Sequence, residues 1–277
     1  MKIIFFGTGN YALPVIDELK KEFNITVFTT ETEKHHPLIK YASDNNLSVV
    51  SFSSFKKDEI KKEVQKTGSE LAVVASFRWL IPGEILNLFQ KGVLNVHPSL
   101  LPKYRGATPG QSAILNGDKK TGISIIKLDQ EMDHGPILWQ KEEEIKEDDT
   151  AKSLYLRLFK IASEVIVDIA KKYIDGALVP IPQEEEKASY VKTVKRDSGY
   201  IDLNNPPSQE TIKRMIRAYY PWPGAWTIAD LNNKKLRIKL LPNKMLQIEG
   251  KKPVSFKDFI NGYSEGKNIL LKLNLSS

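Results

Sequence analysis

One feature restricts the fold of this 277-residue chain more than any other: short apolar runs alternate with helical patterns along the sequence. Each run is rich in Val, Ile, Leu or Phe, and between runs apolar residues recur at the spacing of an amphipathic helix. Strands that alternate with helices form parallel βαβ units in one sheet. We therefore predict an α/β fold with helices on both faces of a mostly parallel sheet. The predicted strands span 2–6, 24–29, 47–51, 70–75, 92–96 and 122–128, and two of the predicted helices span 11–22 and 151–174.

A break in the pattern near residue 221 divides the chain. Pro221, Pro223 and Gly224 cannot continue the helix predicted for 208–220. The remaining residues offer little for an independent core: strand patterns at 236–241 and 245–249 and a helical pattern at 255–263. We predict a large domain over 1–186, a connecting segment over 187–226, and a small, shortened, β-rich carboxyl-terminal domain over 227–277.

Charge is distributed unevenly along the chain. Residues 1–186 hold 24 Lys and Arg against 27 Asp and Glu, whereas residues 187–277 hold 17 against 7. A nearly neutral body with a basic carboxyl-terminal third suits a polyanionic substrate. A general abundance of lysine in the source proteome would give the same counts, so that alternative stays open.

The residue types present exclude several kinds of chemistry. The chain has no cysteine, which excludes disulfides and thiolate catalysis, and its four histidines lack the partners of a zinc site, so we expect no metal. No apolar run approaches the ~20 residues of a membrane span, and Gly7 ends the first apolar run too early for a signal peptide. We therefore expect a cytoplasmic protein that does not bind membranes.

Three polar residues are placed to form one site. Asn95 and His97 lie two apart on a predicted strand, so they project from the same face, and Pro98 ends that strand. Ligands of open α/β sheets bind outside the carboxyl ends of the strands, and the loop after the strand at 122–128 brings Asp133 to this edge. An amide, an imidazole and a carboxylate together can support acyl transfer without a metal.

Several motifs accompany these residues, and together they resemble the formyltransferases that use 10-formyltetrahydrofolate. The similarity covers roughly the first 226 residues, and the combination is more specific than any single motif. The matching motifs are Phe6-Gly7-Thr8-Gly9, Asn95-Val96-His97, Ser99-Leu100-Leu101-Pro102, Arg105-Gly106-Ala107-Thr108-Pro109, Asp133-His134-Gly135-Pro136, a run from Tyr190, and Arg217-Ala218-Tyr219-Tyr220-Pro221-Trp222-Pro223-Gly224-Ala225-Trp226.

The resemblance implies transfer of a formyl group to the amino group of initiator methionyl-tRNA, for translation initiation, by a Rossmann-like catalytic domain. Asn95 would donate to the formyl oxygen, protonated His97 would stabilise the same oxygen, and Asp133 would orient the imidazole and help to move protons. Asn95 or His97 alone would more often make turn hydrogen bonds at a strand end. The motif selects Asp133 over Asp129, which we then predict to cap a turn, and we expect His134 to be exposed.

The resemblance also implies where folate binds, between two loops at 77–82 and 128–133. The family usually has Gly where this chain has Arg78, so a close backbone approach there would need rearrangement. Arg78 either meets the glutamate of the folate or is a solvated loop residue, and both alternatives stay open. The implied folate contacts are Phe77, Arg78, Leu80, Pro82, Ser99, Leu100, Leu101, Pro102 and Leu128.

Two alternatives lie outside this chemistry. Gly7-Thr8-Gly9-Asn10-Tyr11-Ala12 fits a dinucleotide fingerprint, with Glu31 or Glu33 for the ribose, but a nicotinamide enzyme leaves Asn95, His97 and Asp133 unexplained. A non-enzymatic nucleic-acid-binding protein could use the basic third, although the lysines there lack the interleaved aromatic residues of a stacking platform.

The third alternative shares the chemistry. Sugar N-formyltransferases have the same catalytic set and often a shortened carboxyl-terminal region, which makes an amino-sugar nucleotide the alternative acceptor. The segment 219–226 and the basic third favour methionyl-tRNA. Against it, the loop at 30–37 is shorter than the basic loop with which the family grips the acceptor stem; Lys34, His35 and His36 either do part of that work or form a solvated tip. We expect a monomer whose partners are folate and initiator methionyl-tRNA.

Overall fold

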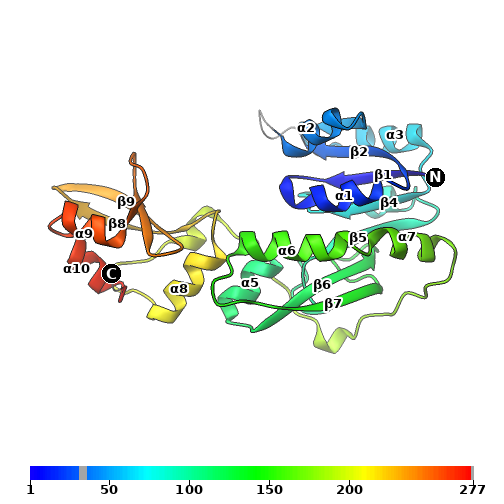
Figure 1. Cartoon of the computed structure of the whole chain (residues 1–277). Helices are drawn as coiled ribbons and strands as arrows, with labels where there is room; N and C mark the ends of the chain where they lie inside the picture. The colour runs from blue at the N-terminus through cyan, green and yellow to red at the C-terminus, as the bar shows by residue number, and fades with distance from the viewer. Residues whose placement is uncertain (31–35, 276–277) are drawn as a thin grey trace. The chain divides into compact units, whose positions relative to one another are not determined.

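The computed structural model describes residues 1–30 and 36–275, and the chain forms two compact units (Figure 1). Unit 1 comprises Met1–Pro109, Lys120–Glu144 and Tyr155–Val191. Unit 2 comprises Gly110–Lys119, Ile145–Leu154 and Lys192–Ser277. Because each unit gathers several chain segments, the units do not test the boundaries expected at residues 186 and 226, which stay a prediction.

Unit 1 is built on a seven-stranded sheet, which confirms the α/β class. Its strands are β1 (Lys2–Gly7), β2 (Asn24–Thr30), β3 (Ser48–Phe52), β4 (Leu71–Ala75), β5 (Gly92–His97), β6 (Lys120–Lys127) and β7 (Ile137–Glu144). The order is β3-β2-β1-β4-β5-β6-β7, and the first five strands are parallel. The sheet is therefore mostly parallel, as expected.

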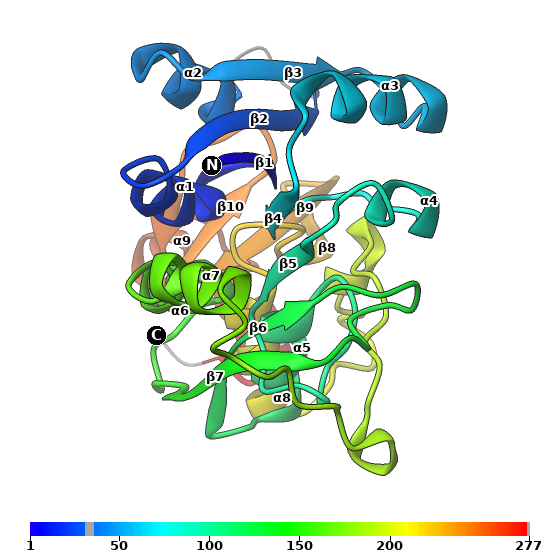
Figure 2. The ribbon, with the colours of Figure 1, turned by 90° about the vertical axis from the view of Figure 1, so that its right-hand side faces the viewer.

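Helices cover both faces of this sheet. They are α1 (Leu13–Leu19), α2 (Pro37–Asp44), α3 (Lys57–Thr67), α4 (Gly83–Leu86), α6 (Ala151–Ser163) and α7 (Ile166–Ile174). Figure 2 shows α1, α6 and α7 on one side of the strands and α3 and α4 on the other. On the side of α3, its buried Ile60 and Val64 belong to one apolar cluster with Phe6 and Phe28 of the sheet. Burial of this kind contributes roughly 1.5–3 kcal/mol for each large apolar side chain.

The long helix predicted for 151–174 is instead two helices, α6 and α7. The hydroxyl of Ser163 donates to the carbonyl of Lys160 at 2.7 Å, which competes with the helical ladder, and Val165 leaves the helical conformation with φ −121°. The helical pattern is correct on both sides of this break.

The sixth strand departs from the expected parallel arrangement. β6 runs antiparallel to β5, with Leu94 opposite Lys127 and His97 opposite Ser124. The loop after β6 therefore begins beside the middle of β5 rather than at its carboxyl end. β7, which was not predicted from the sequence, is the antiparallel edge strand. It ends in Glu142-Glu143-Glu144, of which Glu142 and Glu144 are exposed; such a run is not typical of a strand but suits an edge.

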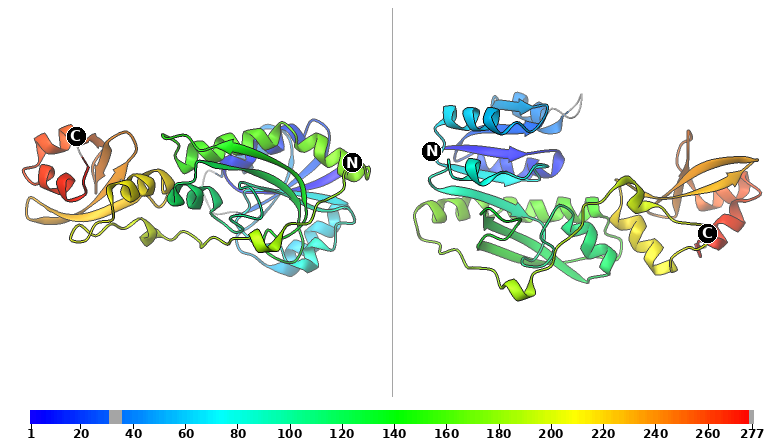
Figure 3. Two further views of the ribbon diagram at one scale, coloured as in Figure 1. Left: turned by 90° about the horizontal axis from the view of Figure 1, so that it is seen from below. Right: turned by 180° about the vertical axis from the view of Figure 1, so that it is seen from behind.

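Unit 2 contains a small antiparallel sheet, which confirms the β-rich carboxyl-terminal part. Its strands β8 (Ala225–Leu231), β9 (Lys234–Leu241), β10 (Met245–Ile248) and β11 (Val254–Ser255) have the order β11-β10-β9-β8. Within the described residues β11 and β8 are edges, so the four strands do not close into a barrel. The helices of this unit are α5 (Pro109–Asn116), α8 (Gln209–Ala218), α9 (Phe256–Gly262) and α10 (Gly266–Lys272), and α9 and α10 pack against each other beside the sheet (Figure 3).

The core of unit 2 joins α8 to the sheet. Ile212, Met215 and Ile216 on one face of α8 are buried in the same cluster as Ile238 and Leu240 of β9. Ser208 caps the helix by accepting a hydrogen bond from the amide of Thr211, and the turn after Tyr219 ends it. The short sheet therefore shares its core with α8 rather than standing alone.

Candidate active site

The structure brings Asn95, His97 and Asp133 together, as their spacing predicted. The Asn95 side-chain amide donates to Oδ1 of Asp133 at 3.2 Å, and Nδ1 of His97 lies 3.4 Å from the same oxygen. The other oxygen, Oδ2, accepts the backbone N–H of Gly106 at 2.8 Å. The carboxylate is thus held at both oxygens, and its side chain is 13% exposed.

His97 is fixed from both sides. While Nδ1 faces Asp133, Nε2 lies 3.0 Å from the backbone carbonyl oxygen of Tyr104. Both ring nitrogens therefore face oxygen atoms, and these two contacts fix the orientation of the ring. The ring is buried, with 4% of the residue exposed.

Asp129, the competing carboxylate, turns away from the three residues. Its Oδ1 accepts the backbone N–H of Glu131 at 3.0 Å, so it caps the turn, and its Oδ2 lies 2.6 Å from Nδ1 of His134. This hydrogen bond raises the pKa of His134 above its usual value. His134, expected to be exposed, is only 39% exposed at its side chain because it packs against Asp129.

The loops expected to hold folate lie beside one another. Phe77, Trp79 and Leu128 pack on the same apolar cluster of unit 1, and a Cβ on Gly83 would come within 3.0 Å of the Gln130 side chain. Pro82 precedes α4, whereas Arg78 and Leu80 are exposed, Leu80 to 64%. The loop at 77–82 thus presents a mixed apolar and cationic surface beside the loop at 128–133, which carries Asp133.

The Ser99-Leu100-Leu101-Pro102 segment is tied to the sheet by its backbone. The Ser99 hydroxyl is fully buried and donates to the carbonyl of Lys103 at 2.7 Å, and the amide of Leu101 donates to the hydroxyl of Ser124 at 3.2 Å. The side chains of Ser99 and Leu101 point into the protein, whereas Leu100 and Pro102 are partly exposed. The segment therefore holds the turn after β5 in place.

Two residues of this region were not singled out as site residues from the sequence. Arg105 is completely buried and pairs with Glu185, and the Gln183 side chain bonds to the loop that carries Asp133. Their guanidinium and amide groups contact one another across 78 residues of sequence, so no local pattern links them. The Arg105 guanidinium also holds the pKa of the Glu185 carboxyl below its usual value.

The glycine-rich first turn leads into a single 3-10 turn, Asn10–Ala12, rather than directly into an α-helix. Gly9 has φ 74°, a conformation that glycine adopts most readily. Glu31, Glu33, Lys34 and His35 lie outside the described residues. His36 is described, and its ring is buried with Nε2 3.4 Å from the Thr29 hydroxyl, so it does not form a surface contact.

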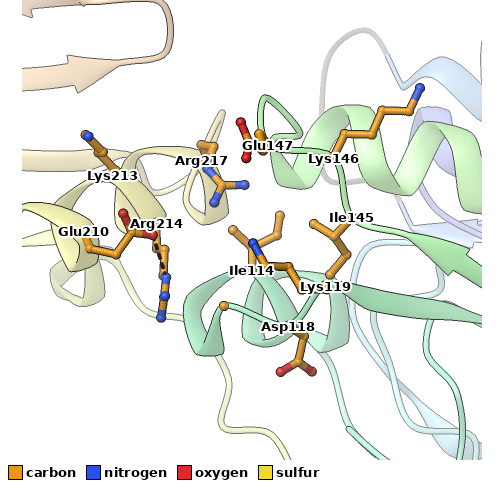
Figure 4. A pocket seen from close by; sticks show the side chains of 11 residues that line it. Ile114, Asp118, Lys119, Ile145, Lys146, Glu147, Glu210, Lys213, Arg214 and Arg217 are labelled. Atoms are coloured by element: carbon orange, nitrogen blue, oxygen red, sulfur yellow. Dashed lines mark hydrogen bonds and ion pairs between the residues drawn. The ribbon is translucent and has the colours of Figure 1, made fainter.

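Unit 2 holds a separate pocket of about 280 Å³. Figure 4 shows that it is lined by side chains from the end of α5, the segment before α6, and α8. Arg214 pairs with Glu210 at 3.2 Å, and its guanidinium packs directly over Gly117. The remaining lining groups carry an excess of positive charge. They are Ile114, Asp118, Lys119, Ile145, Lys146, Glu147, Lys213 and Arg217.

Neither a metal site nor a membrane-spanning helix is found among the described residues. In the part of the chain that the structure describes, no group of three or more His, Cys, Asp or Glu side chains could hold a metal ion. Over the same residues, no helix has the length and apolar character needed to cross a membrane.

Two segments of this chain match known protein families. The formyl transferase family matches residues 1–170, and the formyl transferase C-terminal domain matches residues 193–244. The chain belongs to the formyltransferase family. This formyltransferase is 35% identical to the methionyl-tRNA formyltransferase of Caldanaerobacter subterraneus subsp. tengcongensis, over 86% of this chain and 79% of that one. It is 34% identical to a methionyl-tRNA formyltransferase of Thermus thermophilus, over 82% and 75%.

Solved structures share the fold of this formyltransferase. A sugar N-formyltransferase from a Shewanella species superimposes with a TM-score of 0.68 at 20% identity, over 88% of this chain and 98% of that one. A 4-N formyltransferase from Francisella tularensis gives the same values, a TM-score of 0.68 at 20% identity over 88% and 98%. At this identity the likeness concerns the fold alone.

Proposed function

We propose that this formyltransferase transfers the formyl group of 10-formyltetrahydrofolate to the amino group of initiator methionyl-tRNA, for translation initiation. The observation that carries the proposal is the 35% identity to a methionyl-tRNA formyltransferase over 86% of this chain. The contacts among Asn95, His97 and Asp133 support the chemistry, because they place an amide donor and a carboxylate at one point.

The reaction moves one acyl group and one proton. The folate supplies the formyl group already activated on its N10 nitrogen. The amine nitrogen bonds to the formyl carbon, the bond from that carbon to N10 breaks, and the proton lost by the amine ends on the folate nitrogen. The enzyme must therefore stabilise charge on the formyl oxygen and accept and return one proton.

Asn95 is suited to the first task. Its side-chain amide has two N–H groups, and one of them is used by Asp133 at 3.2 Å. The other is directed by the same contact and can donate to the formyl oxygen as that oxygen becomes negative. A donor of this kind typically contributes ~3 kcal/mol to the transition state.

Asp133 and His97 serve the second task. Asp133 is the acceptor that can take the proton of the attacking amine, directly or through water, and His97 lies 3.4 Å from the same carboxylate oxygen. Because Nε2 of His97 already faces the Tyr104 carbonyl, His97 acts through the Asp133 carboxylate that it contacts rather than by a direct bond to the formyl oxygen.

The folate would lie against the loops at 77–82 and 128–133. Phe77 and Leu128 supply apolar contacts, and the 64% exposed side chain of Leu80 offers a surface that a flat ring can cover. Arg78 is exposed in the same loop, which fits either a contact with the folate glutamate or a solvated residue. The resemblance also implies contacts at Pro82, Leu100 and Pro102, which are partly exposed.

The tRNA would contact the basic carboxyl-terminal third. Lys213 and Arg217 of this third line the pocket of unit 2 together with Lys146 from the preceding part of the chain, and phosphate oxygens would neutralise the excess positive charge there. We further propose that the enzyme acts in the cytoplasm as a monomer, since the chain has no cysteine that would suit an oxidising compartment and its substrate is a tRNA.

An amino-sugar nucleotide is the second candidate acceptor. Two observations favour it: the likeness of the fold to a sugar N-formyltransferase over 98% of that chain, and the small size of the sheet in unit 2. The higher identity to methionyl-tRNA formyltransferases outweighs both.

The test is to incubate the protein with 10-formyltetrahydrofolate and, separately, initiator methionyl-tRNA and a set of amino-sugar nucleotides. We expect formylated methionyl-tRNA and no formylated sugar. Efficient formylation of a sugar with none of the tRNA would reject the tRNA proposal and leave formyl transfer standing.

A further inference from the structure

The loop that carries Asp133 is held by one amide side chain from a distant segment. Nε2 of Gln183 donates to the backbone carbonyl oxygens of Asp133 and Gly135, both at 2.8 Å. An amide nitrogen has two hydrogens, so each carbonyl receives one of them. Gln183 follows the short bridge between Ile137 and Ile181, which anchors its segment to the start of β7.

The orientation of the Gln183 amide is imposed by Arg105. Nε and one terminal nitrogen of Arg105 donate to the Gln183 carbonyl oxygen at 3.2 and 3.0 Å. A guanidinium can only donate, so it draws the oxygen toward itself and directs the NH₂ group toward the loop. Arg105 is in turn held by two hydrogen bonds to Glu185 and one to the Tyr190 hydroxyl, at 2.8 to 2.9 Å.

The loop needs this support because its backbone is constrained. Asp133 has φ 51°, a left-handed conformation that aspartate adopts more readily than most residues but less readily than glycine. Two residues later Gly135 passes so close to β6 that a Cβ would lie 1.8 Å from the Lys127 carbonyl oxygen. The two carbonyls bound by Gln183 belong to these two residues.

We infer that Gln183, oriented by Arg105, is a positioning residue for formyl transfer: it holds Asp133 in the backbone conformation that places its carboxylate against Asn95 and His97. This inference rests on the proposed function. A displacement of ~1 Å at a catalytic group can lower the rate by ~10²-fold, so the effect should lie in kcat.

The experiment uses Gln183→Met, which keeps the volume and removes both hydrogen bonds to the loop. We expect kcat for formylation of methionyl-tRNA to fall by roughly 10- to 100-fold, with both KM values within about 3-fold of wild type. In an Asp133→Ala background the same substitution should lower kcat by less than about 2-fold, because no carboxylate remains to be placed. Equal losses in both backgrounds would indicate a general structural defect and overturn the inference.

Two further variants keep the test decisive. Gln183→Glu retains an acceptor for Arg105 but turns a carboxylate oxygen, in place of the two donors, toward the carbonyls of Asp133 and Gly135. It should therefore show at least the same loss of kcat, and it serves if Gln183→Met fails to fold. Asn45→Ala is the matched control: it removes an amide hydrogen bond to the Tyr41 carbonyl, 2.8 Å long, and a contact with Lys20, elsewhere in unit 1. Its kcat should be unchanged.

Hydrogen exchange of residues 129–135 separates this inference from the proposed function, since it needs no substrate. We expect faster exchange of this segment in Gln183→Met than in wild type or Asn45→Ala. If wild type forms no formylmethionyl-tRNA but the exchange is faster, the proposed function fails and the positioning of Asp133 stands. Unchanged exchange, or kcat within about 2-fold of wild type in both Gln183 variants, overturns the inference.

Discussion

One carboxylate oxygen of Asp133 lies 3.4 Å from Nδ1 of His97, although His97 ends β5 and Asp133 follows β6, which runs antiparallel to β5. The loop after β6 starts beside the middle of β5, and within this loop Asp133 has a left-handed backbone conformation and its carboxylate contacts Asn95 and His97 of β5. Gly106 and Asn95 then bind the same carboxylate. The contact therefore depends on the conformation of the loop as much as on the strands.

Alanine at Asn95, His97 or Asp133 should lower kcat by ~10²-fold or more, while the protein stays folded. Asp129→Ala should have a milder effect, because Asp129 caps the turn and binds His134 rather than the other three residues. Steady-state kinetics with methionyl-tRNA, together with thermal unfolding of each variant, measure both outcomes. The assignment is rejected if Asp129→Ala abolishes turnover and Asp133→Ala does not.

Protonation of His134 should stabilise the fold at low pH. Its hydrogen bond to Asp129 raises its pKa in the folded protein above the ordinary value. The stabilisation is therefore fully present below a pH of about 6.5 and is lost as the pH rises through the folded pKa. His134→Gln keeps a neutral hydrogen bond and removes the charge, so it isolates this contribution.

For His134→Gln we expect a lower Tm than wild type near pH 5.5 and little difference near pH 9. Because the side chains are partly exposed, the difference should not exceed ~1 kcal/mol, or about 2–4 °C. Thermal unfolding across this pH range measures it. A difference that grows with pH would contradict the sign of the effect.

Ligand protection distinguishes a formyltransferase from a nicotinamide enzyme. A stable reduced-folate analogue should raise Tm by mass action, whereas NAD and NADP should not. The glycine turn leads into a 3-10 turn at Asn10–Ala12 and packs Gly7 against Phe5 and Leu38, which gives it a role in the core. Protection by micromolar NAD without protection by folate would favour the oxidoreductase alternative.

The sequence predicted the parallel strands well because their signal is local. Buried runs such as Leu71–Ala75 are apolar throughout, so period and length identify them. β7 and β8 were not predicted from the sequence, for different reasons. β7 ends in three glutamates at a sheet edge, and β8 begins directly after the Pro221-Trp222-Pro223-Gly224 turn, within the segment that was predicted to connect the two domains.

The proximity of the three candidate residues was predicted in part for the same reason. Asn95 and His97 share a strand, so their proximity follows from a period of two, and the motif selected Asp133. Arg105 and Gln183 are 78 residues apart and meet only in the folded chain. Their roles follow from one buried guanidinium, whose charge must be paired, and no pattern along the sequence contains that information.

The tRNA surface can be tested without truncation. Removing residues 227–277 would expose Ile212, Met215 and Ile216 of α8, because their core partners lie on β9 and β10. A point substitution in the pocket of unit 2 avoids this problem. Lys213→Ala removes one exposed charge from α8, and Lys62→Ala on α3 removes one that does not line the pocket.

Counterion release makes phosphate contacts depend on salt, so KM for methionyl-tRNA should rise steeply between ~50 and ~200 mM salt in the wild type. Lys213→Ala should raise this KM by roughly 3- to 10-fold at ~50 mM salt and reduce the slope of log KM against log salt by about one, while kcat and the KM for folate stay unchanged. Lys62→Ala should behave as wild type.

A nucleotide-sugar carries only two phosphates and would show a much shallower slope. A salt-insensitive KM in the wild type would therefore reject tRNA as the acceptor, whereas a steep slope that Lys213→Ala leaves unchanged would reject only the pocket as its contact.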